Sequence, residues 1–554
     1  MSELSFLGLP GEIAVRARAH LGEGAEALLR GDPWELLRVP GVRPAQADRF
    51  ALSVLPSADP QDLRRGRALV EFLLAEAARR GDTALPGEEV VKALRGLRIA
   101  DPVAAVQAAL DEARVMLFHL EPEFPDGADW ADGAGGAGGA DGDIDELPDA
   151  QEWLALARYG LAEEAVSEGV QRLAATAPPI EAGPDAPEHG EAARQALFHG
   201  VSVVAGPPGS EDGLIADLRA LEPFLPVPVT VAAVTATAAA RHEGAVSLHR
   251  LLEAREGLGG LGYARGEQWP LEPGVVVVTG AEALDVELAA ALVEACPDDA
   301  HLVLAGDPGG LASYRPGRVL ADLVEAQAVP VTPAPPEDGP LTELCEGVRA
   351  GVLRRVEAPG REVVVVPAAD GREAAHRVGQ LLADSIPRVL GIAARDVQVL
   401  TPGPAGTAAL NTALKARLNP GPGVCGGFDA GDRVVVAVPF AEAAAGETGT
   451  VAEASPDGLT VEFPDAVVRV PAASLPRLRA GWAIPVQQAV GTRWPAVVAV
   501  FPGSGELSGP LVLTAVTRAL EHLSVVTAAG PALAEAVADF GPLKRKTRLV
   551  SLFF

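Results

Sequence analysis

The segment GVSVVAGPPGSEDG, residues 200–213, joins a short apolar run to a turn rich in glycine and proline. A phosphate-binding loop begins in this way, because the turn after a buried strand exposes backbone N–H groups to an anion. In the working pattern G-x-x-x-x-G-K-S/T, the lysine reaches the terminal phosphates and the hydroxyl binds magnesium. Gly206 opens this pattern, but the chemical positions hold Glu211, Asp212 and Gly213. The sequence therefore predicts the frame of a nucleotide site without its working residues.

Short apolar runs alternate with helical stretches around this segment. Such alternation is typical of parallel sheets, whose ligands bind at the carboxyl ends of the strands. Short strands and turns between residues 428 and 478 predict a small inserted barrel. The expected fold class is therefore α/β with two parallel-sheet domains. Their apolar runs lie at residues 201–204, 229–234, 275–278 and 301–306, and then at 363–366, 396–400, 496–501 and 522–529.

The N-terminal 120 residues consist of short helical stretches separated by turns. Val39-Pro40-Gly41-Val42, followed by Arg43, is similar to the turn of a helix-hairpin-helix unit, whose N–H groups hold a DNA phosphate. An ordinary Pro-Gly turn between packed helices is the alternative. Residues 7–11 form a weaker copy, and residues 61–118 have the apolar spacing of a further helical module.

Residues 121–150 contain many acids, a Gly/Ala core and no lysine or arginine, which predicts a flexible linker. An acidic partner-binding segment is the alternative. Residues 151–175 return to helical periodicity. The basic cluster at 544–548 is either a phosphate contact or a solvated end.

Composition limits the functions open to the chain. Its 554 residues are 48% hydrophobic, enough for the cores of about three or four domains. The three cysteines lack metal-site spacing and predict neither disulfides nor a zinc site. No apolar run approaches a membrane span and the N-terminus lacks a secretion signal, so we expect a cytoplasmic protein without a membrane partner. Because the formal net charge is −30, any DNA contact must come from local arginine clusters.

Further motifs follow the loop in a fixed order. Residues 247–252 are SLHRLL and resemble T-I-H-R-L-L, and Gly306-Asp307-Pro308 resembles G-D-P in G-D-P-x-Q-L. Residues 431–434 and 446–449 match the opening of an inserted barrel, and residues 513–519, LTAVTRA, resemble Y-T-A-V-T-R-A. Together these motifs resemble the RecD-type helicases of superfamily one, in the stand-alone form with an N-terminal helix-hairpin-helix region.

The resemblance implies two RecA-like motor domains, an inserted SH3-like β-barrel and an N-terminal all-α region. The implied segments are 1–120, the helical region with helix-hairpin-helix motifs; 121–150, the acidic linker; 151–335, the first RecA-like domain with preceding helices; 336–427 and 479–554, the two parts of the second RecA-like domain; and 428–478, the barrel.

The resemblance also implies a nucleotide site and a path for DNA. Residues left from the nucleotide site are Gly206, Pro207, Pro208, Gly209, Ser210, Asp307 and Arg518, whose family counterpart reaches the ATP γ-phosphate. Implied DNA contacts are Thr235, Thr237, His249, Thr514 and Thr517, together with Pro40, Gly41 and Arg43 of the hairpin.

The sequence departs from the family pattern at the positions that bind phosphate and magnesium and that orient the attacking water. Asp212 replaces the lysine and reverses its charge, and Gly213 lacks the magnesium-binding hydroxyl. Thr279-Gly280 stands where the family has its metal-binding acid and water-positioning base. We therefore expect no catalytic residue, no metal ligand and no cofactor, with ATP and magnesium bound only if the site works after all. Further departures are Gly310 and His189 for two glutamines, residues 487–491 for H-K-S-Q-G, and no arginine at 335–345.

These observations favour a non-hydrolysing pseudo-helicase that binds DNA or a repair or recombination protein. On this hypothesis Arg518 forms a structural ion pair across the motor cleft, and His249 is a packing residue. One alternative is an active ATP-dependent 5′-to-3′ DNA helicase, in which Arg241 or Arg315 replaces the lysine. The other is a protein–protein scaffold that binds no nucleic acid.

Overall fold

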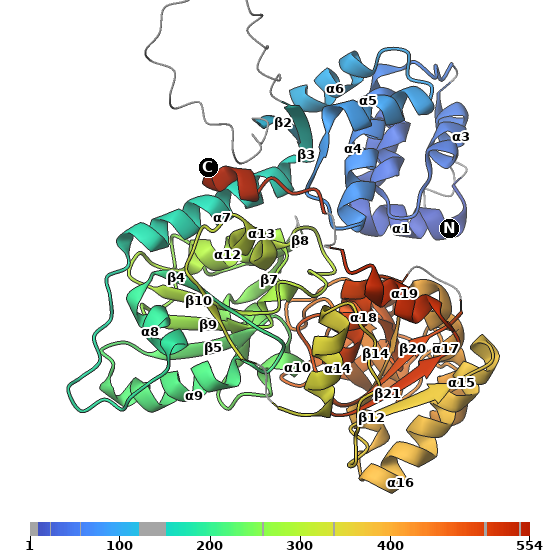
Figure 1. The fold of residues 1–554 in the computed structure, drawn as a ribbon. Coiled ribbons are helices and arrows are strands. Elements are labelled where there is room, and N and C mark those ends of the chain that lie inside the picture. The colour runs from blue at the N-terminus through green and yellow to red at the C-terminus, as the bar shows by residue number, and fades with distance from the viewer. Residues whose placement is uncertain are drawn as a thin grey trace, which may run out of the picture. The chain divides into compact units, whose positions relative to one another are not determined.

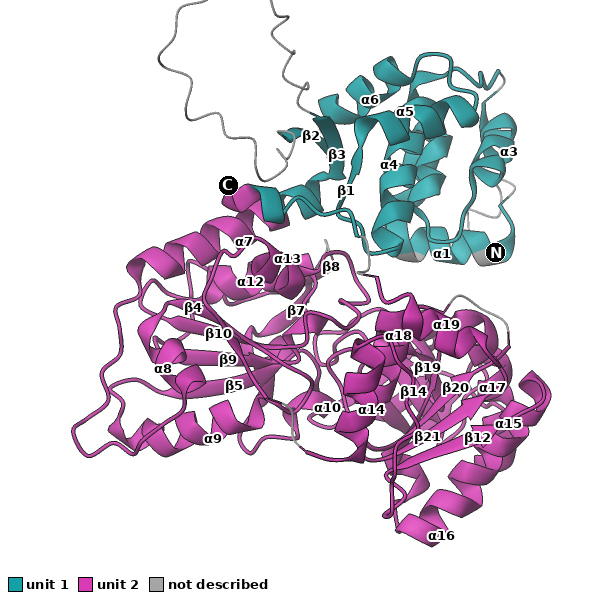
Figure 2. Cartoon of the chain, in the orientation of Figure 1, with its two compact units in different colours: residues 1–161, 545–551 teal, residues 162–544, 552–554 magenta. Residues whose placement is uncertain are grey.

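The computed structural model describes residues 9–22, 24–55, 57–120, 151–257, 260–335, 338–503, 507–541 and 545–554 (Figure 1). The linker predicted for residues 121–150 lies outside these ranges. The chain forms two compact units (Figure 2): a first unit of Met1–Leu161 with Arg545–Ser551, and a second unit of Ala162–Lys544 with Leu552–Phe554. Within the described ranges, no helix combines the length and the apolar character that crossing a membrane requires.

Helices form most of the first unit, which confirms the helical N-terminal region. The longest helix that lies wholly within it, α4 (Leu63–Arg79), buries Leu69, Val70 and Leu74 because apolar residues recur along one of its faces. Asp62 caps α4 by accepting a hydrogen bond from the Arg64 N–H. The other helices are α1 (Gly11–Leu21), α2 (Ala25–Gly31), α3 (Pro44–Val54), α5 (Gly87–Gly96), α6 (Pro102–Asp111) and the 3-10 helix η2 (Pro33–Arg38).

A three-stranded antiparallel sheet completes the first unit, so this unit is not all-α as the sequence predicted. Strand β3 (Gln151–Leu156) pairs with β1 (Ala84–Pro86) on one side and with β2 (Val115–Leu120) on the other. Both partners precede the acidic linker in sequence. Local periodicity cannot reveal pairing over that distance, and the helix predicted from residue 151 begins at Ala157 as α7 (Ala157–Thr176).

The C-terminal segment 545–551 also belongs to the first unit, whereas the sequence predicts it to be part of the second RecA-like domain. The Thr83 N–H donates to the Lys546 carbonyl (2.9 Å), and the Lys546 N–H donates to Asp82 (3.1 Å). The buried Arg548 guanidinium donates to the Gly160 carbonyl (3.1 Å) and covers the Phe118 ring. In the basic cluster 544–548, Lys546 and Arg548 therefore contact other residues of the first unit. Lys544 lies outside the described residues.

A six-stranded parallel sheet organises the first half of the second unit and confirms the predicted α/β class. Its order is β11-β4-β10-β9-β5-β6. In the parallel register, Ala205 of β4 lies beside Gly306 of β10, and Ala305 of β10 beside Thr279 of β9. The loops after β4, β9 and β10 therefore meet at one edge. The strands are β4 (Val201–Ala205), β5 (Val229–Ala233), β6 (Val246–Ser247), β9 (Val275–Thr279), β10 (His301–Gly306) and β11 (Val331–Pro333).

Helices connect the strands of this first parallel sheet, and a short hairpin projects from the connection between β6 and β9. The hairpin consists of β7 (Ala254–Gly257) and β8 (Gly260–Tyr263), which pair antiparallel. The helices are α8 (Glu191–Phe198), α9 (Asp212–Leu221), α10 (Ala236–Ala239), α11 (Leu248–Leu251), α12 (Val286–Ala295) and α13 (Val319–Glu325).

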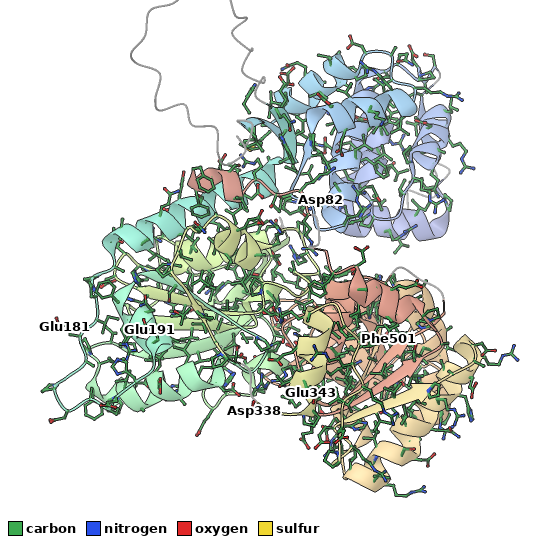
Figure 3. All side chains as sticks on the ribbon, in the orientation of Figure 1. Asp82, Glu181, Glu191, Asp338, Glu343 and Phe501 are labelled. Carbon is green, nitrogen blue, oxygen red and sulfur yellow. The ribbon has the colours of Figure 1, made fainter. Side chains whose placement is uncertain are left out.

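A second parallel sheet, ordered β12-β21-β20-β13-β19, forms the other half of the second unit. Phe501 at the end of β20 is buried, whereas Glu181, Glu191 and Glu343 are exposed on the same unit (Figure 3). The strands are β12 (Val363–Pro367), β13 (Val397–Thr401), β19 (Ala483–Pro485), β20 (Trp494–Phe501) and β21 (Ala519–Thr527). The helices are α14 (Pro340–Arg349), α15 (Gly371–Gln380), α16 (Ile386–Leu390), α17 (Pro404–Leu418), α18 (Gly509–Thr517) and α19 (Ala532–Ala538).

Five antiparallel strands lie between β13 and β19, where the sequence predicts an SH3-like barrel. They pair in the order β17-β16-β15-β14-β18 and enclose a core that includes Val434, Val461 and Val470. The strands are β14 (Arg433–Val436), β15 (Thr448–Ser455), β16 (Gly458–Glu462), β17 (Val467–Pro471) and β18 (Leu478–Ala480). This inserted sheet also contributes Glu447, just before β15, to contacts with the first parallel sheet domain.

Candidate functional site

The loop at residues 206–213 follows β4 at the carboxyl edge of the first parallel sheet. The Gly206 N–H donates to the Gly306 carbonyl (3.0 Å), which fixes the start of the loop against β10. Gly209 has a φ of +103°, and helix α9 begins at Asp212. The strand, turn and helix of a phosphate-binding loop are therefore all present.

The carboxylate of Glu211, within the loop itself, binds one of the backbone N–H groups of the loop. Glu211 is only 5% exposed, and its Oε2 accepts a hydrogen bond of 2.7 Å from the Gly209 N–H. In a working loop such N–H groups bind phosphate oxygens. Here an internal carboxylate already accepts the hydrogen bond of this N–H group.

Two arginines surround the loop. Arg241 lies 3.6 Å from Glu211 Oε1 and 3.5 Å from Asp212 Oδ2. Arg493 reaches the loop from the second parallel sheet domain, since a Cβ built on Gly209 would lie 2.5 Å from its Nη1. Arg315, the other predicted lysine substitute, instead pairs with Asp285 (3.0 Å). Arg241 thus lies near the loop as an ion-pair partner of its acids.

The end of β9 carries no acidic side chain. Thr279 is 4% exposed, and its hydroxyl lies 3.5 Å from the Ala232 carbonyl. Gly280 has a φ of +62°, and a Cβ there would lie 2.9 Å from both Cα and O of Gly491. The position of the family's base therefore leaves no space for a side chain.

Another acidic residue, Glu282, lies at the site, two positions after Gly280 in the sequence. Glu282 is buried, and burial raises the pKa of its carboxyl, while the nearby Arg518 opposes that rise. Its Oε1 lies 3.5 Å from Nη1 of Arg518, which is itself 2% exposed. The arginine that the family uses on the γ-phosphate is thus paired with an internal carboxylate. Motif alignment missed Glu282 because it lies outside the D-E positions.

Asp307 and Arg349 form a second ion pair across the site. The two guanidinium nitrogens lie 3.1 and 2.6 Å from the two carboxylate oxygens, so the pair is bidentate. Arg349 is the last residue of α14, beyond the window 335–345 in which the sequence analysis found no arginine. The only sequence feature that could have indicated Arg349 is that it is the one basic residue of α14.

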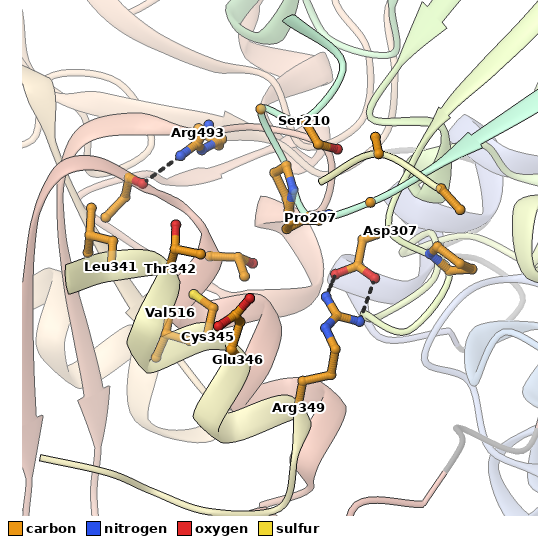
Figure 4. Close-up of a pocket in the computed structure, with 18 residues that line it drawn as sticks. Pro207, Ser210, Asp307, Leu341, Thr342, Cys345, Glu346, Arg349, Arg493 and Val516 are labelled. Atoms are coloured by element: carbon orange, nitrogen blue, oxygen red, sulfur yellow. Dashed lines mark hydrogen bonds and ion pairs between the residues drawn. The ribbon is translucent and has the colours of Figure 1, made fainter. Parts of the chain in front are cut away.

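A cavity of about 390 Å³ lies between the loop and these groups (Figure 4). Arg349 joins Asp307 on one side of it, and Arg493 donates to the Ala519 carbonyl (3.1 Å) on the other. The loop residues that line the cavity are Gly206, Pro207, Pro208, Gly209 and Ser210. All the residues that the sequence predicts for the nucleotide site line it except Arg518, which is buried and lies against Glu282.

Three threonines among the implied DNA contacts are buried. Thr235 (3% exposed) shares a 2.8 Å hydrogen bond with Thr492, and the Thr514 hydroxyl (2% exposed) accepts from the Leu311 N–H (2.8 Å). Thr517 (6% exposed) accepts from the Arg518 guanidinium (3.0 Å). In this arrangement their hydroxyls bind protein groups and do not face solvent.

His249 is also buried, and burial lowers the pKa of its imidazole to about 4, so the ring is neutral. Its ring packs edge-on to Tyr263, with 5.8 Å between the centroids. Thr237 is half-buried, and Glu447 of the inserted sheet accepts hydrogen bonds from its N–H (3.1 Å) and its hydroxyl. These two residues therefore also make internal contacts.

The predicted hairpin turn of the first unit is exposed at its tip. Val39 and Val42 are buried, while Pro40, Gly41 and Arg43 are exposed, and Gly41 has a φ of +82°. The Val42 N–H donates to the Val39 carbonyl (3.1 Å), and the Arg43 N–H donates to Gln46 (2.8 Å). The Arg43 guanidinium is therefore the clearest group here for contacting an anion.

Comparison with known proteins gives family matches to two parts of the chain. The family model described as the ATP-dependent RecD2 DNA helicase HHH domain matches residues 1–84, and a model of an AAA domain matches residues 189–315. The ATP-dependent RecD2 DNA helicase of Deinococcus radiodurans is 30% identical over 397 residues, which cover 65% of this chain and 53% of that protein. The chain thus spans about half the length of that relative.

Other relatives cover smaller parts or share less identity. The RecBCD enzyme subunit RecD of Mycolicibacterium smegmatis is 33% identical over 210 residues, 31% of this chain and 37% of that subunit. Among solved structures, Pif1 helicase from Candida albicans superposes with a TM-score of 0.36 at 14% identity, covering 66% of this chain and 93% of that one.

Proposed function

We propose that the chain, which is similar to the RecD-type helicases of superfamily one, is a pseudo-helicase that does not hydrolyse ATP. It retains the two parallel sheets of the motor as a binding platform for DNA or for a DNA-repair or recombination protein. On this proposal the chain has no ATPase activity and needs no cofactor, and its partner is DNA or a DNA-repair or recombination protein.

The observation that carries the proposal is the hydrogen bond from the Gly209 N–H to Glu211. A triphosphate entering the loop would displace one carboxylate and still lie beside a second, Asp212, at the lysine position. At an effective dielectric constant near 20, two unit charges about 4 Å apart interact by roughly 4 kcal/mol, so this sign reversal disfavours nucleotide binding strongly. Arg241 offsets part of this effect because it lies within 3.6 Å of both acids.

Loss of the hydrolytic groups supports the same proposal. Phosphoryl transfer depends on metal ions at the β- and γ-oxygens and on a group that orients the attacking nucleophile. Gly213 offers no hydroxyl, Thr279 offers no carboxylate, and Gly280 is packed against Gly491. Arg349 and Arg518 are each paired with a carboxylate of the chain.

Nucleotide titration tests this function directly. We expect calorimetry to show no ATP binding at millimolar nucleotide with or without magnesium, and no ATPase activity in the presence of single-stranded DNA. The triple variant Glu211→Gly, Asp212→Lys, Gly213→Ser restores the loop pattern, and we expect it to bind ATP without hydrolysing it. Magnesium-dependent hydrolysis by the unchanged protein, stimulated by single-stranded DNA and abolished by Arg518→Ala, would instead establish an active helicase.

DNA binding by the platform is tested separately. The exposed turn around Arg43 favours a DNA-binding platform over a scaffold without nucleic-acid contact. We expect a fluorescent DNA hairpin to bind at about 50 mM salt and to dissociate as salt rises, because contacts to phosphates release counterions. Absence of binding at low salt would favour the scaffold.

A further inference from the structure

Two segments of the first parallel sheet domain bring three metal-ligand side chains together. Glu211 and Asp212 lie at the start of α9, and His242 lies three residues after α10. One ligand atom from each residue lies within 4.8 Å of the other two. The two segments are about thirty residues apart and contain no spaced metal-binding motif, so the sequence does not predict this cluster.

Two of these atoms are buried without a hydrogen-bond partner among the described residues. They are His242 Nε2 and Asp212 Oδ1, which lie 3.9 Å apart, and the His242 side chain is only 10% exposed. That separation is too long for a hydrogen bond. Buried polar atoms left without a partner are destabilising by about 1–3 kcal/mol each, so a ligand that bridges these two facing atoms would stabilise both.

The separation suits an ion between them. Zinc binds imidazole nitrogen and carboxylate oxygen at about 2.0–2.2 Å, which places two tetrahedral ligands about 3.4 Å apart. The His242–Asp212 separation of 3.9 Å needs to shorten by only about half an ångström to reach this value, while Glu211 lies within 4.8 Å of both. Glu211 uses Oε2 for the Gly209 N–H and leaves Oε1 as the third ligand atom.

Arg241 lies 3.6 Å from Glu211 and 3.5 Å from Asp212, and Arg493 also interacts with the charges of both acids. These distances exceed ordinary hydrogen bonds, and the Arg241 guanidinium faces Oδ2 of Asp212, whereas His242 faces Oδ1. Asp212 is thus able to bind an ion through one oxygen while the other remains near Arg241.

A second group of carboxylates in the first unit lacks these features. Glu35, Glu71 and Glu112 also lie close together, but Arg67 pairs with Glu35 and Glu112, and Arg114 contacts all three. Its anions are neutralised by arginine, and it contains no imidazole.

We propose that Glu211, Asp212 and His242 form a binding site for one divalent transition-metal ion of the zinc class. Mixed imidazole and carboxylate ligands suit such an ion, and three protein ligands leave a further position for water. All three ligands come from the protein, so the site requires no nucleotide. Two residues of the loop at 206–213, Glu211 and Asp212, then serve as metal ligands.

Zinc uptake by the untagged, full-length, chelator-treated protein tests the site. Equilibrium dialysis with elemental analysis gives the stoichiometry, and calorimetry gives the affinity. We expect one zinc ion per chain in the unchanged protein and in the control Glu243→Gln, which alters an exposed acid next to His242. We expect His242→Gln and Asp212→Asn each to weaken binding at least about tenfold, because both remove a direct ligand.

A second readout separates binding from misfolding. Saturating zinc should raise the unfolding temperature of the unchanged protein and of Glu243→Gln, but not that of a folded His242→Gln variant. Cobalt substitution should give an absorption spectrum of nitrogen and oxygen ligation that His242→Gln alters. The proposal is overturned if the protein takes up no zinc at micromolar free ion, or if His242→Gln binds with unchanged affinity and stoichiometry. Neither result depends on ATP, so the pseudo-helicase proposal is judged independently.

Discussion

Gly280 at the end of β9 packs against the backbone of Gly491, so that a Cβ on Gly280 would lie 2.9 Å from both the Cα and the carbonyl oxygen of Gly491. Gly280 also has a left-handed φ of +62°, which only glycine adopts without strain. The two parallel sheet domains therefore meet backbone to backbone where the family has its water-positioning acid. A side chain at this position requires the domains to move apart.

Gly280→Ala is expected to destabilise the protein through two effects. The left-handed backbone costs about 1–2 kcal/mol for a residue with a Cβ, and overlap with a backbone that cannot rotate away adds about 1–3 kcal/mol. Gly530→Ala is the matched control, because Gly530 has a similar φ of +57° with no atom within 4 Å of its added Cβ. Urea unfolding should show the larger loss for Gly280→Ala. Equal losses would mean that the Gly491 contact does not constrain this position.

Arg518→Ala is expected to lower the free energy of unfolding by about 3–5 kcal/mol, because it leaves the buried Glu282 without its cation. The double variant Glu282→Gln, Arg518→Met removes both charges and should be less destabilised than Arg518→Ala alone. A double-mutant cycle in urea measures this coupling. If Arg518→Ala left stability unchanged, the ion-pair role of Arg518 would be wrong.

Glu447 is expected to make stability depend on pH. Burial raises the pKa of its carboxyl from 4.5 to about 7, although hydrogen bonds from Thr237 and Ala236 oppose the rise. The folded state then binds the proton more tightly than the unfolded state. The contribution of Glu447 to stability is therefore full below about pH 4.5, declines as pH rises towards 7, and stays constant above that value.

Glu447→Gln should remove this decline, since the amide does not ionise. Unfolding free energies at pH 5.5 and pH 8 should differ less in this variant than in the unchanged protein. Glu453→Gln alters an exposed acid of β15 in the same sheet and should leave the difference unaltered. An identical pH dependence in Glu447→Gln would show that other groups control it.

The sequence predicted the strands better than the contacts between domains. Runs such as Val275–Val278 and Val363–Val366 are β-branched, apolar and short, so their own composition identifies β9 and β12. Strand β3 was missed because its partners lie far away in the chain.

The altered loop was predicted from its residues, but the hydrogen bond from the Gly209 N–H to Glu211 was not, because it depends on the side-chain conformation. Glu282, Arg349 and Arg493 were also missed as members of the site. Each enters from outside the aligned motifs, and only the folded arrangement of the two sheets brings them together.

Arg43 is expected to supply the DNA contact of the first unit. Its guanidinium is exposed beside the turn, whereas the N–H groups of Val42 and Arg43 are bound within the protein. Arg43→Glu should weaken binding of a DNA hairpin about tenfold at low salt and reduce the dependence of log affinity on log salt by about one phosphate contact. Arg49→Glu makes the same charge change on an exposed residue of α3 and should have a smaller effect. Equal losses in both variants would indicate a general charge effect, whereas no loss in Arg43→Glu would leave the turn as a packing element between helices.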